Sequence, residues 1–206
     1  MQRSVVIAAL LVLLMPVVAF AAPTREGQWD MGFNLSGAMP DDSDLEGTAF
    51  VGGQVSYGVT PWIAIGAEIG GASFDQNDET RSLGITDLGT LTGVPLMITG
   101  IFRANLENQA FVPYGVVGLG LIFWNYDESD QLDAAHVNVN ADTSFAGKVG
   151  GGVDWFVNNN WIANFEGSYY MNDANVELEL NGVTIAQDDV NTSFWLVGGG
   201  AKYVFN

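Results

Sequence analysis

Seven charged residues stand singly inside otherwise apolar, alternating segments of this sequence. They are Asp30, Glu68, Arg103, Lys148, Asp154, Glu166 and Lys202. A buried charge without a partner is costly, so these acids and bases are expected to form a network. Such a network can be a polar filling of the protein interior or a route for protons or ions.

Large apolar side chains occupy the same strand faces as these charges, nearer the opposite strand ends. They are Phe50, Met97, Ile122, Trp124, Tyr170, Phe194 and Leu196. Together they predict an apolar mouth above a charged plug, suited to binding a small hydrophobic molecule. The alternative is that these side chains simply fill the top of a narrow barrel.

Catalytic chemistry has little support in the residue types. The chain has no Cys and one His, His136, with no serine in a recognisable motif beside it. Cysteine nucleophiles, Cys-ligated metals and His clusters are therefore excluded, and no enzyme activity and no cofactor are expected. The Asp42-x-Asp44-x-Glu46-Gly47 rhythm resembles the start of a calcium loop, but Gly53 replaces the glutamate expected at its twelfth position.

The composition fixes the broad class. The 206 residues carry 24 acids against 6 Lys and Arg, a net charge of −18, yet 48% are hydrophobic. The hydrophobic content argues against disorder, and the acidity argues against nucleic-acid binding. Gly 26 and 12% aromatic residues indicate a β architecture.

The N-terminus predicts export. Arg3 precedes an apolar run over residues 5–20, and Ala19-Phe20-Ala21 forms a cleavage site. Residues 1–21 are therefore expected to be a signal peptide, and residues 22–206 the mature domain.

Eight segments then alternate between apolar and polar residues with the period of two typical of strands. They cover residues 29–36, 49–57, 62–69, 96–103, 116–123, 144–155, 161–171 and 194–205. Aromatic residues at the ends of the outward faces predict an interfacial belt: Trp29, Tyr57, Phe102, Trp155, Trp161 and Tyr203. A soluble lipocalin-like barrel would alternate too, but would place its apolar face inside.

The connections predict the topology. Residues 58–61, 105–109 and 157–160 are short turns, whereas 37–48, 71–93, 125–142 and 172–192 are long, acidic loops. This is the plan of an antiparallel outer-membrane barrel with periplasmic turns and extracellular loops. Within the last loop, residues 176–185 predict a hairpin turning at Asn181 and Gly182.

Three stretches resemble the OmpW family of eight-stranded outer-membrane proteins. They are PYGVVGLG at 113–120, DTSFAG at 142–147 with GVDW at 152–155, and NNWIAN at 159–164. The resemblance covers roughly residues 56–205 and implies passage of small hydrophobic molecules through a narrow barrel. Similar strands occur in the broader OmpA-like and OmpX-like barrels.

The sequence thus predicts an all-β, eight-stranded, antiparallel up-and-down transmembrane β-barrel in the outer membrane. Its expected partners are outer-membrane lipid and lipopolysaccharide, the barrel assembly machinery, and a small hydrophobic ligand. The alternative is a non-transporting barrel whose acidic loops serve structural, adhesive or receptor roles.

Overall fold

The structure, a computed structural model, describes residues 25–42, 45–75, 89–104, 110–128, 137–141, 143–180 and 183–205. Ten strands are present among these residues: β1 (Trp29–Pro40), β2 (Thr48–Gly58), β3 (Ile63–Phe74), β4 (Gly89–Arg103), β5 (Phe111–Glu128), β6 (Val137–Ala141), β7 (Ser144–Phe156), β8 (Trp161–Leu180), β9 (Val183–Asn191) and β10 (Phe194–Phe205). The predicted signal peptide, residues 1–21, lies outside the described residues, as does His136.

Eight of the described strands close into an antiparallel barrel in the order β1, β2, β3, β4, β5, β7, β8 and β10, and β10 pairs with β1. The closing register runs from Trp29 opposite Phe205 to Pro40 opposite Phe194. Closure gives every barrel strand two neighbours, so the backbone N–H and C=O groups of each strand can pair within the sheet. The predicted fold is confirmed.

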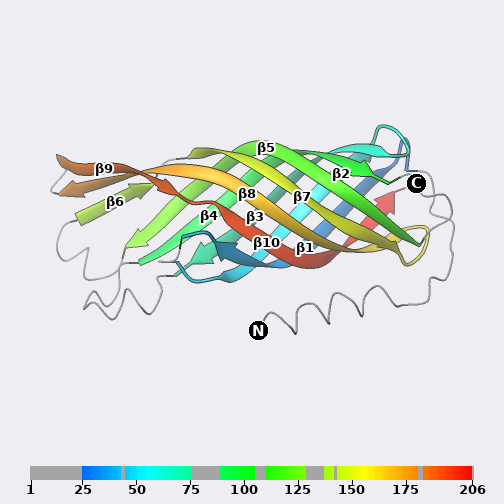
Figure 1. Ribbon diagram of the computed structural model, residues 1–206, viewed down its shortest axis with the longest axis horizontal. Coiled ribbons are helices and arrows are strands. Elements are labelled where there is room, and N and C mark those ends of the chain that lie inside the picture. Colours follow the sequence, from blue (N-terminus) through cyan, green and yellow to red (C-terminus); the bar gives the residue numbers. More distant parts are fainter. Residues whose placement is uncertain are drawn as a thin grey trace.

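The strands extend further than the alternating segments indicated. β1, β3, β4, β5 and β8 all continue into stretches predicted to be loops (Figure 1). There, β6 and β9 both pair with the end of β8, and Leu180 lies opposite Val183 as in the predicted hairpin. Asn181 and Gly182, the predicted turn residues, lie outside the described residues. We call this end of the barrel the loop end and the opposite end the turn end.

The turn end is compact where the structure describes it. Between β2 and β3, the Thr60 hydroxyl accepts hydrogen bonds from the backbone N–H groups of Trp62 and Ile63, at 3.3 and 2.9 Å. β3 therefore begins at Ile63, and Trp62 belongs to the turn with 47% of its surface exposed. The sequence pattern wrongly placed Trp62 on the inward face of the strand.

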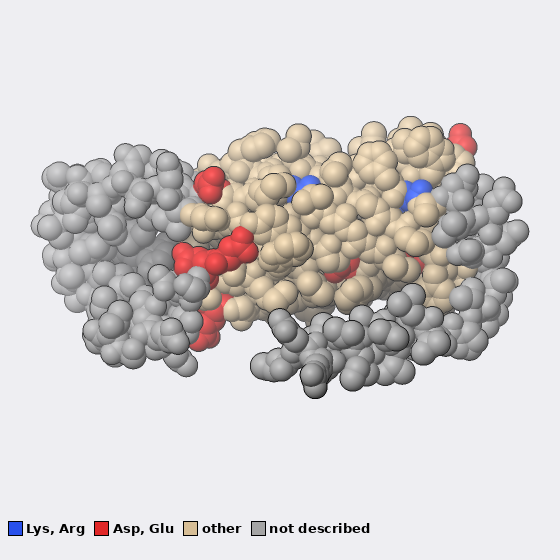
Figure 2. Space-filling model, in the orientation of Figure 1, with Lys and Arg blue, Asp and Glu red and all other residues tan. Residues whose placement is uncertain are grey.

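The outer wall is apolar and the interior carries the charges. Ile98, Leu119 and Phe145 are 69%, 61% and 66% exposed, whereas Asp154 and Lys202 are 0% and 1% exposed. This arrangement excludes the lipocalin-like alternative and suits a wall surrounded by hydrocarbon. Figure 2 shows the wall as a broad band almost free of charge. Among the described residues, no helix is long and apolar enough to cross a membrane.

Aromatic rings gather at the turn-end margin of this wall. Trp29 lies against Tyr57 with ring centroids 5.0 Å apart, and Trp161 against Tyr203 at 5.2 Å. All four rings are exposed on the outside. They occupy the position where amphipathic aromatic side chains favour a membrane–water interface.

Candidate functional site

The barrel lumen divides into an apolar half at the loop end and a half toward the turn end, here called the charged half, that holds the buried charges together with two smaller apolar clusters. Alternation puts both kinds of residue on the inward faces, and on several strands this face changes from charged to apolar toward the loop end, as from Lys202 to Leu196 on β10. All fourteen residues predicted to line the lumen point inward. Their division into separate groups defines the site.

The apolar half is one buried cluster, here called the apolar cluster. It contains all seven predicted mouth residues together with four more: Ala38, Phe50, Ala72, Phe74, Met97, Ile122, Trp124, Ala146, Tyr170, Phe194 and Leu196. The Tyr170 and Phe194 rings stack with centroids 4.9 Å apart and planes inclined by 8°. Most members come from different strands, so the cluster lines the lumen on several sides.

Glycines on the inward face make room for the large rings. A Cβ atom at Gly70 would lie 2.1 Å from the Phe50 ring, and one at Gly93 would lie 2.5 Å from the Trp124 ring. The indole N–H of Trp124 donates to Ser144 Oγ at 2.9 Å and to Asn172 Oδ1 at 3.1 Å. The ring is therefore held against the wall at one edge and by hydrogen bonds at the other.

Below the apolar cluster lies the mid-lumen group, formed by Glu68, Lys148 and Glu166 with two tyrosines. Lys148 Nζ lies 2.6 Å from Glu68 and 2.9 Å from Glu166. The Tyr170 hydroxyl donates to Glu68, and the Tyr114 hydroxyl donates to Glu166 at 2.8 Å. One cation and two phenols thus serve two carboxylates, and Tyr170 joins this group to the apolar cluster.

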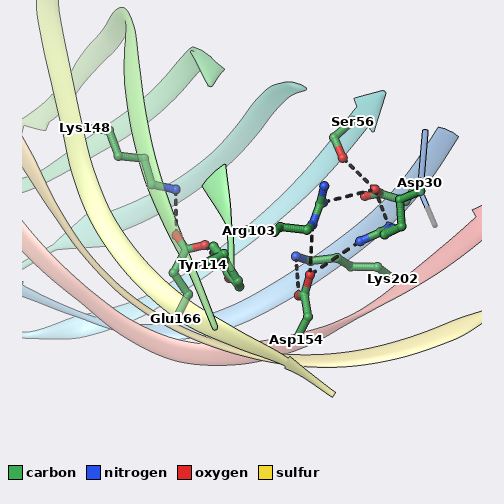
Figure 3. A network of polar contacts seen from close by, with 9 residues as sticks. Asp30, Ser56, Arg103, Tyr114, Lys148, Asp154, Glu166 and Lys202 are labelled. Atoms are coloured by element: carbon green, nitrogen blue, oxygen red, sulfur yellow. Dashed lines mark hydrogen bonds and ion pairs between the residues drawn. The ribbon is translucent and has the colours of Figure 1, made fainter. Parts of the chain in front are cut away.

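Closest to the turn end lies the turn-end group, formed by Arg25, Asp30, Arg103, Asp154 and Lys202 (Figure 3). Lys202 Nζ lies 2.8 Å from Asp154 and 4.8 Å from the centre of the Tyr114 ring. Asp30 accepts a hydrogen bond from Ser56 at 2.6 Å. These side chains are buried, so their mutual pairing decides whether they are tolerated.

The seven predicted charges therefore form two groups instead of one network. The expected association of Asp30, Arg103, Asp154 and Lys202 is present, but Glu68, Lys148 and Glu166 pair among themselves. Tyr114 lies between the two groups, since its hydroxyl donates to Glu166 and its ring lies 4.8 Å from Lys202 Nζ.

Arg25 was missed by sequence reasoning. It precedes β1 and so has no place in the alternating pattern, yet it is only 3% exposed and bonds to Asp30 at 2.5 Å. Burial lowers the pKa of its guanidinium, the nearby charge of Arg103 lowers it further, and Asp30 and Asp154 oppose this effect. A basic residue shortly before the first lumen acid was the available signal.

In the described part of the chain, no group of three or more His, Cys, Asp or Glu side chains is placed so that it could hold a metal ion. Asp44 of the calcium-like rhythm lies outside the described residues. The loop-end half of the lumen presents apolar side chains, whereas the buried ion pairs toward the turn end disfavour apolar molecules.

Comparison with solved structures supports the fold. OprG from Pseudomonas aeruginosa is 16% identical with a TM-score of 0.75, covering 90% of this chain and 99% of its own. Outer membrane protein W from E. coli is 20% identical with a TM-score of 0.59, covering 89% and 100%. AlkL, solved in lipid bilayers, is 20% identical with a TM-score of 0.58, covering 93% and 96%.

Sequence comparison identifies the family. No curated protein is significantly similar to the chain in sequence. The family model for the outer membrane protein beta-barrel domain, however, matches residues 7–205. That match agrees with the closed barrel, its apolar wall and its charged interior. The chain belongs to the outer membrane protein beta-barrel domain family.

Proposed function

We propose that the protein is a narrow binding barrel for small hydrophobic molecules, which enter the loop-end half of the lumen. The observation that carries this proposal is the apolar cluster, a continuous inward-facing apolar layer of eleven residues that is larger than either apolar cluster nearer the turn end. Nearer the turn end, the interior instead mixes buried ion pairs with two smaller apolar clusters. The apolar layer gives a small hydrophobic solute an environment that it prefers to water.

The two charged groups favour binding or entry at the loop end over a straight path along the barrel axis. A hydrophobic solute moving toward the turn end meets Lys148 between Glu68 and Glu166, then Asp154 with Lys202. Displacing such pairs leaves buried charges without partners, which is costly. The ligand instead binds within the apolar cluster, and the side chains of Phe50 and Trp124 must move to make room for it.

A second candidate function is adhesion or reception through the acidic rim. The described rim exposes Asp41, Glu46, Asp75 and Asp173, and Figure 2 shows acidic side chains gathered at this end. If the protein acts as a binding barrel, replacing these four residues with Asn or Gln leaves the uptake of small hydrophobic molecules unchanged. If the rim instead acts in adhesion or reception, the same change removes binding of the partner to the rim at the cell surface.

We also propose that residues 1–21 are cleaved on export and that the mature barrel sits among outer-membrane lipid and lipopolysaccharide after the barrel assembly machinery has inserted it. The apolar run before Ala19-Phe20-Ala21 and the aromatic belt support this. Mass spectrometry of the membrane-inserted protein tests the cleavage site, which is expected after Ala21.

The functional proposal is tested by uptake of N-phenyl-1-naphthylamine, an apolar dye, into cells that produce the barrel. Ile122→Asn places an amide in the apolar cluster, and Ile101→Asn makes the matched change at a buried, inward-facing site in the charged half. We expect uptake to fall for Ile122→Asn alone, at equal amounts of heat-modifiable barrel. Equal uptake by the two variants contradicts the proposal. Met97→Gln, closer in volume, repeats the test if Ile122→Asn does not fold.

A further inference from the structure

Two arginines lie near the same two carboxylate oxygens at the turn end. Arg25 lies 2.5 Å from Asp30 Oδ2 and 3.4 Å from Asp154 Oδ2. Arg103 lies 3.8 Å and 3.6 Å from those same atoms. Arg25 holds the closer position on both, so the two guanidinium groups compete for one site.

The guanidinium of Arg103 makes no hydrogen bond within the described residues. Its Nε, Nη1 and Nη2 atoms are buried and have no hydrogen-bond partner in the part of the chain that the structure describes. Figure 3 shows Arg103 between Asp30 and Asp154. A buried guanidinium usually finds hydrogen-bond partners for its five N–H donors. Here Arg25 occupies the carboxylate oxygens of Asp30 and Asp154 that Arg103 would otherwise bind.

Cations outnumber carboxylates within the turn-end group. Arg25, Arg103 and Lys202 face only Asp30 and Asp154 in this group. Without Arg25, two cations would face two carboxylates. Arg103 would then need to move only about 1 Å to reach the hydrogen-bond distance to both oxygens that Arg25 vacates.

Arg25 also belongs to a short segment whose backbone bonds to the barrel at Gly58. Residues 25–28 precede β1, and Gly27 N–H donates to Gly58 O at 2.8 Å while Gly58 N–H donates to Gln28 O at 2.9 Å. Gly27 has a φ of 76°, which favours glycine. A Cβ at Gly58 would lie 1.8 Å from Arg25 O, so this segment seats closely on the β2 end.

We propose that residues 25–28 form a detachable plug of the turn end, and that Arg103 is a built-in substitute for the arginine the plug carries. In the closed state Arg25 binds Asp30 and Asp154, as observed. In the open state the segment leaves, Arg103 takes over both carboxylates, and water reaches the turn-end group. The device controls polar access to the lumen from the turn end and does not depend on the proposed ligand.

Unfolding equilibria of the full mature barrel in lipid vesicles test the substitution. Arg25→Met and Arg103→Met are each expected to change the unfolding constant less than about tenfold, because the other arginine serves the carboxylates. The double variant is expected to exceed the product of the two effects by about ten- to a hundredfold. Additive effects overturn the proposal. Loss of the folded barrel in the double variant alone is the extreme form of the expected result.

Thiol labelling tests the opening. The chain has no cysteine, so Ser56→Cys beside Asp30 gives a unique reporter under the plug, and Ser168→Cys, equally buried and inward-facing, gives a control farther along the lumen. With a small hydrophilic methanethiosulfonate reagent, Arg25→Met is expected to speed labelling at position 56 more than tenfold and leave position 168 unchanged. Gly27→Ala, which strains the segment but keeps Arg25, is expected to give about a fivefold increase. Unchanged labelling at position 56, or equal increases at both positions, overturns the proposal.

Discussion

The two halves of the lumen solve the same packing problem with opposite chemistry. The loop-end half is filled by the apolar cluster, with Phe50 and Ile122 fully buried. The turn-end half combines ion pairs, in which Asp154 is equally buried, with two smaller apolar clusters that include Ile101 and Phe156. A narrow barrel in lipid can therefore hold a buried network of ion pairs in its lumen, since its apolar wall already satisfies the membrane. The loop-end half differs in that its largest buried side chains form one continuous apolar cluster.

The largest effect is expected where the charged half loses a carboxylate. Asp154→Asn leaves Arg25, Arg103 and Lys202 with Asp30 as the one carboxylate of the turn-end group, and is expected to cost about 3–5 kcal/mol in the free energy of unfolding. Lys202→Met should cost less, because Asp154 keeps two arginines within 3.6 Å. Urea unfolding in lipid vesicles measures both. Equal costs would show that the arginines do not serve Asp154.

The wall that encloses both halves comes next. Leu119→Arg puts a charge on the outer face and is expected to cost about 2–4 kcal/mol. Gln54→Arg is the matched inward change, opposite Glu68 on the neighbouring strand, and is expected to cost little. The same unfolding measurement compares them. A reversed order would mean that the inner and outer faces are exchanged.

A smaller effect is expected from crowding the apolar half. Gly93→Ala brings a methyl group to 2.5 Å from the Trp124 ring and is expected to cost about 1–3 kcal/mol, with a change in tryptophan fluorescence. Gly71→Ala on the neighbouring strand faces outward, where the nearest atom is 3.9 Å away. This control should alter neither stability nor fluorescence. If Gly93→Ala is equally silent, the ring is free to move.

The smallest effect isolates the polar anchor of the apolar half. Trp124→Phe removes the indole donor to Ser144 and Asn172, whose side chains still bond to each other. The expected cost is about 1 kcal/mol, since the remaining groups stay satisfied. A loss several times larger in vesicle unfolding would mean that Trp124 holds the cluster together and has no freedom to admit a ligand.

Strand faces and lumen composition were predictable because a period of two assigns every side chain in a strand to one side. The strand ends were not predictable. Residues 89–93 and 172–180 lack the apolar alternation of membrane-facing segments, yet their backbones pair with β5, β6 and β9. Outside hydrocarbon, a strand needs pairing partners but no apolar face, so the pattern disappears before the strand does.

The turn-end group shows the other limit. Alternation placed Asp30 and Lys202 inside, but Arg25 reaches the lumen from a segment folded back by Gly27 and Gly58. The position of this segment depends on a tertiary contact, which leaves no periodic pattern in the sequence. The pairing partners were likewise hidden, because Tyr114 and Tyr170 act through hydroxyls whose direction depends on neighbouring strands.

Fluorescence of Trp124 tests the central claim most directly. Of the six tryptophans, Trp124 alone is buried in the lumen, so a variant with the other five changed to Phe reports on the apolar cluster. Titration with a short bromoalkanol in vesicles is predicted to quench Trp124 saturably, at concentrations where a Trp195-only variant, on the outer face, shows only gradual quenching from the lipid. Quenching of Trp124 that is absent, or that follows Trp195 without saturation, would contradict a binding role for the apolar half.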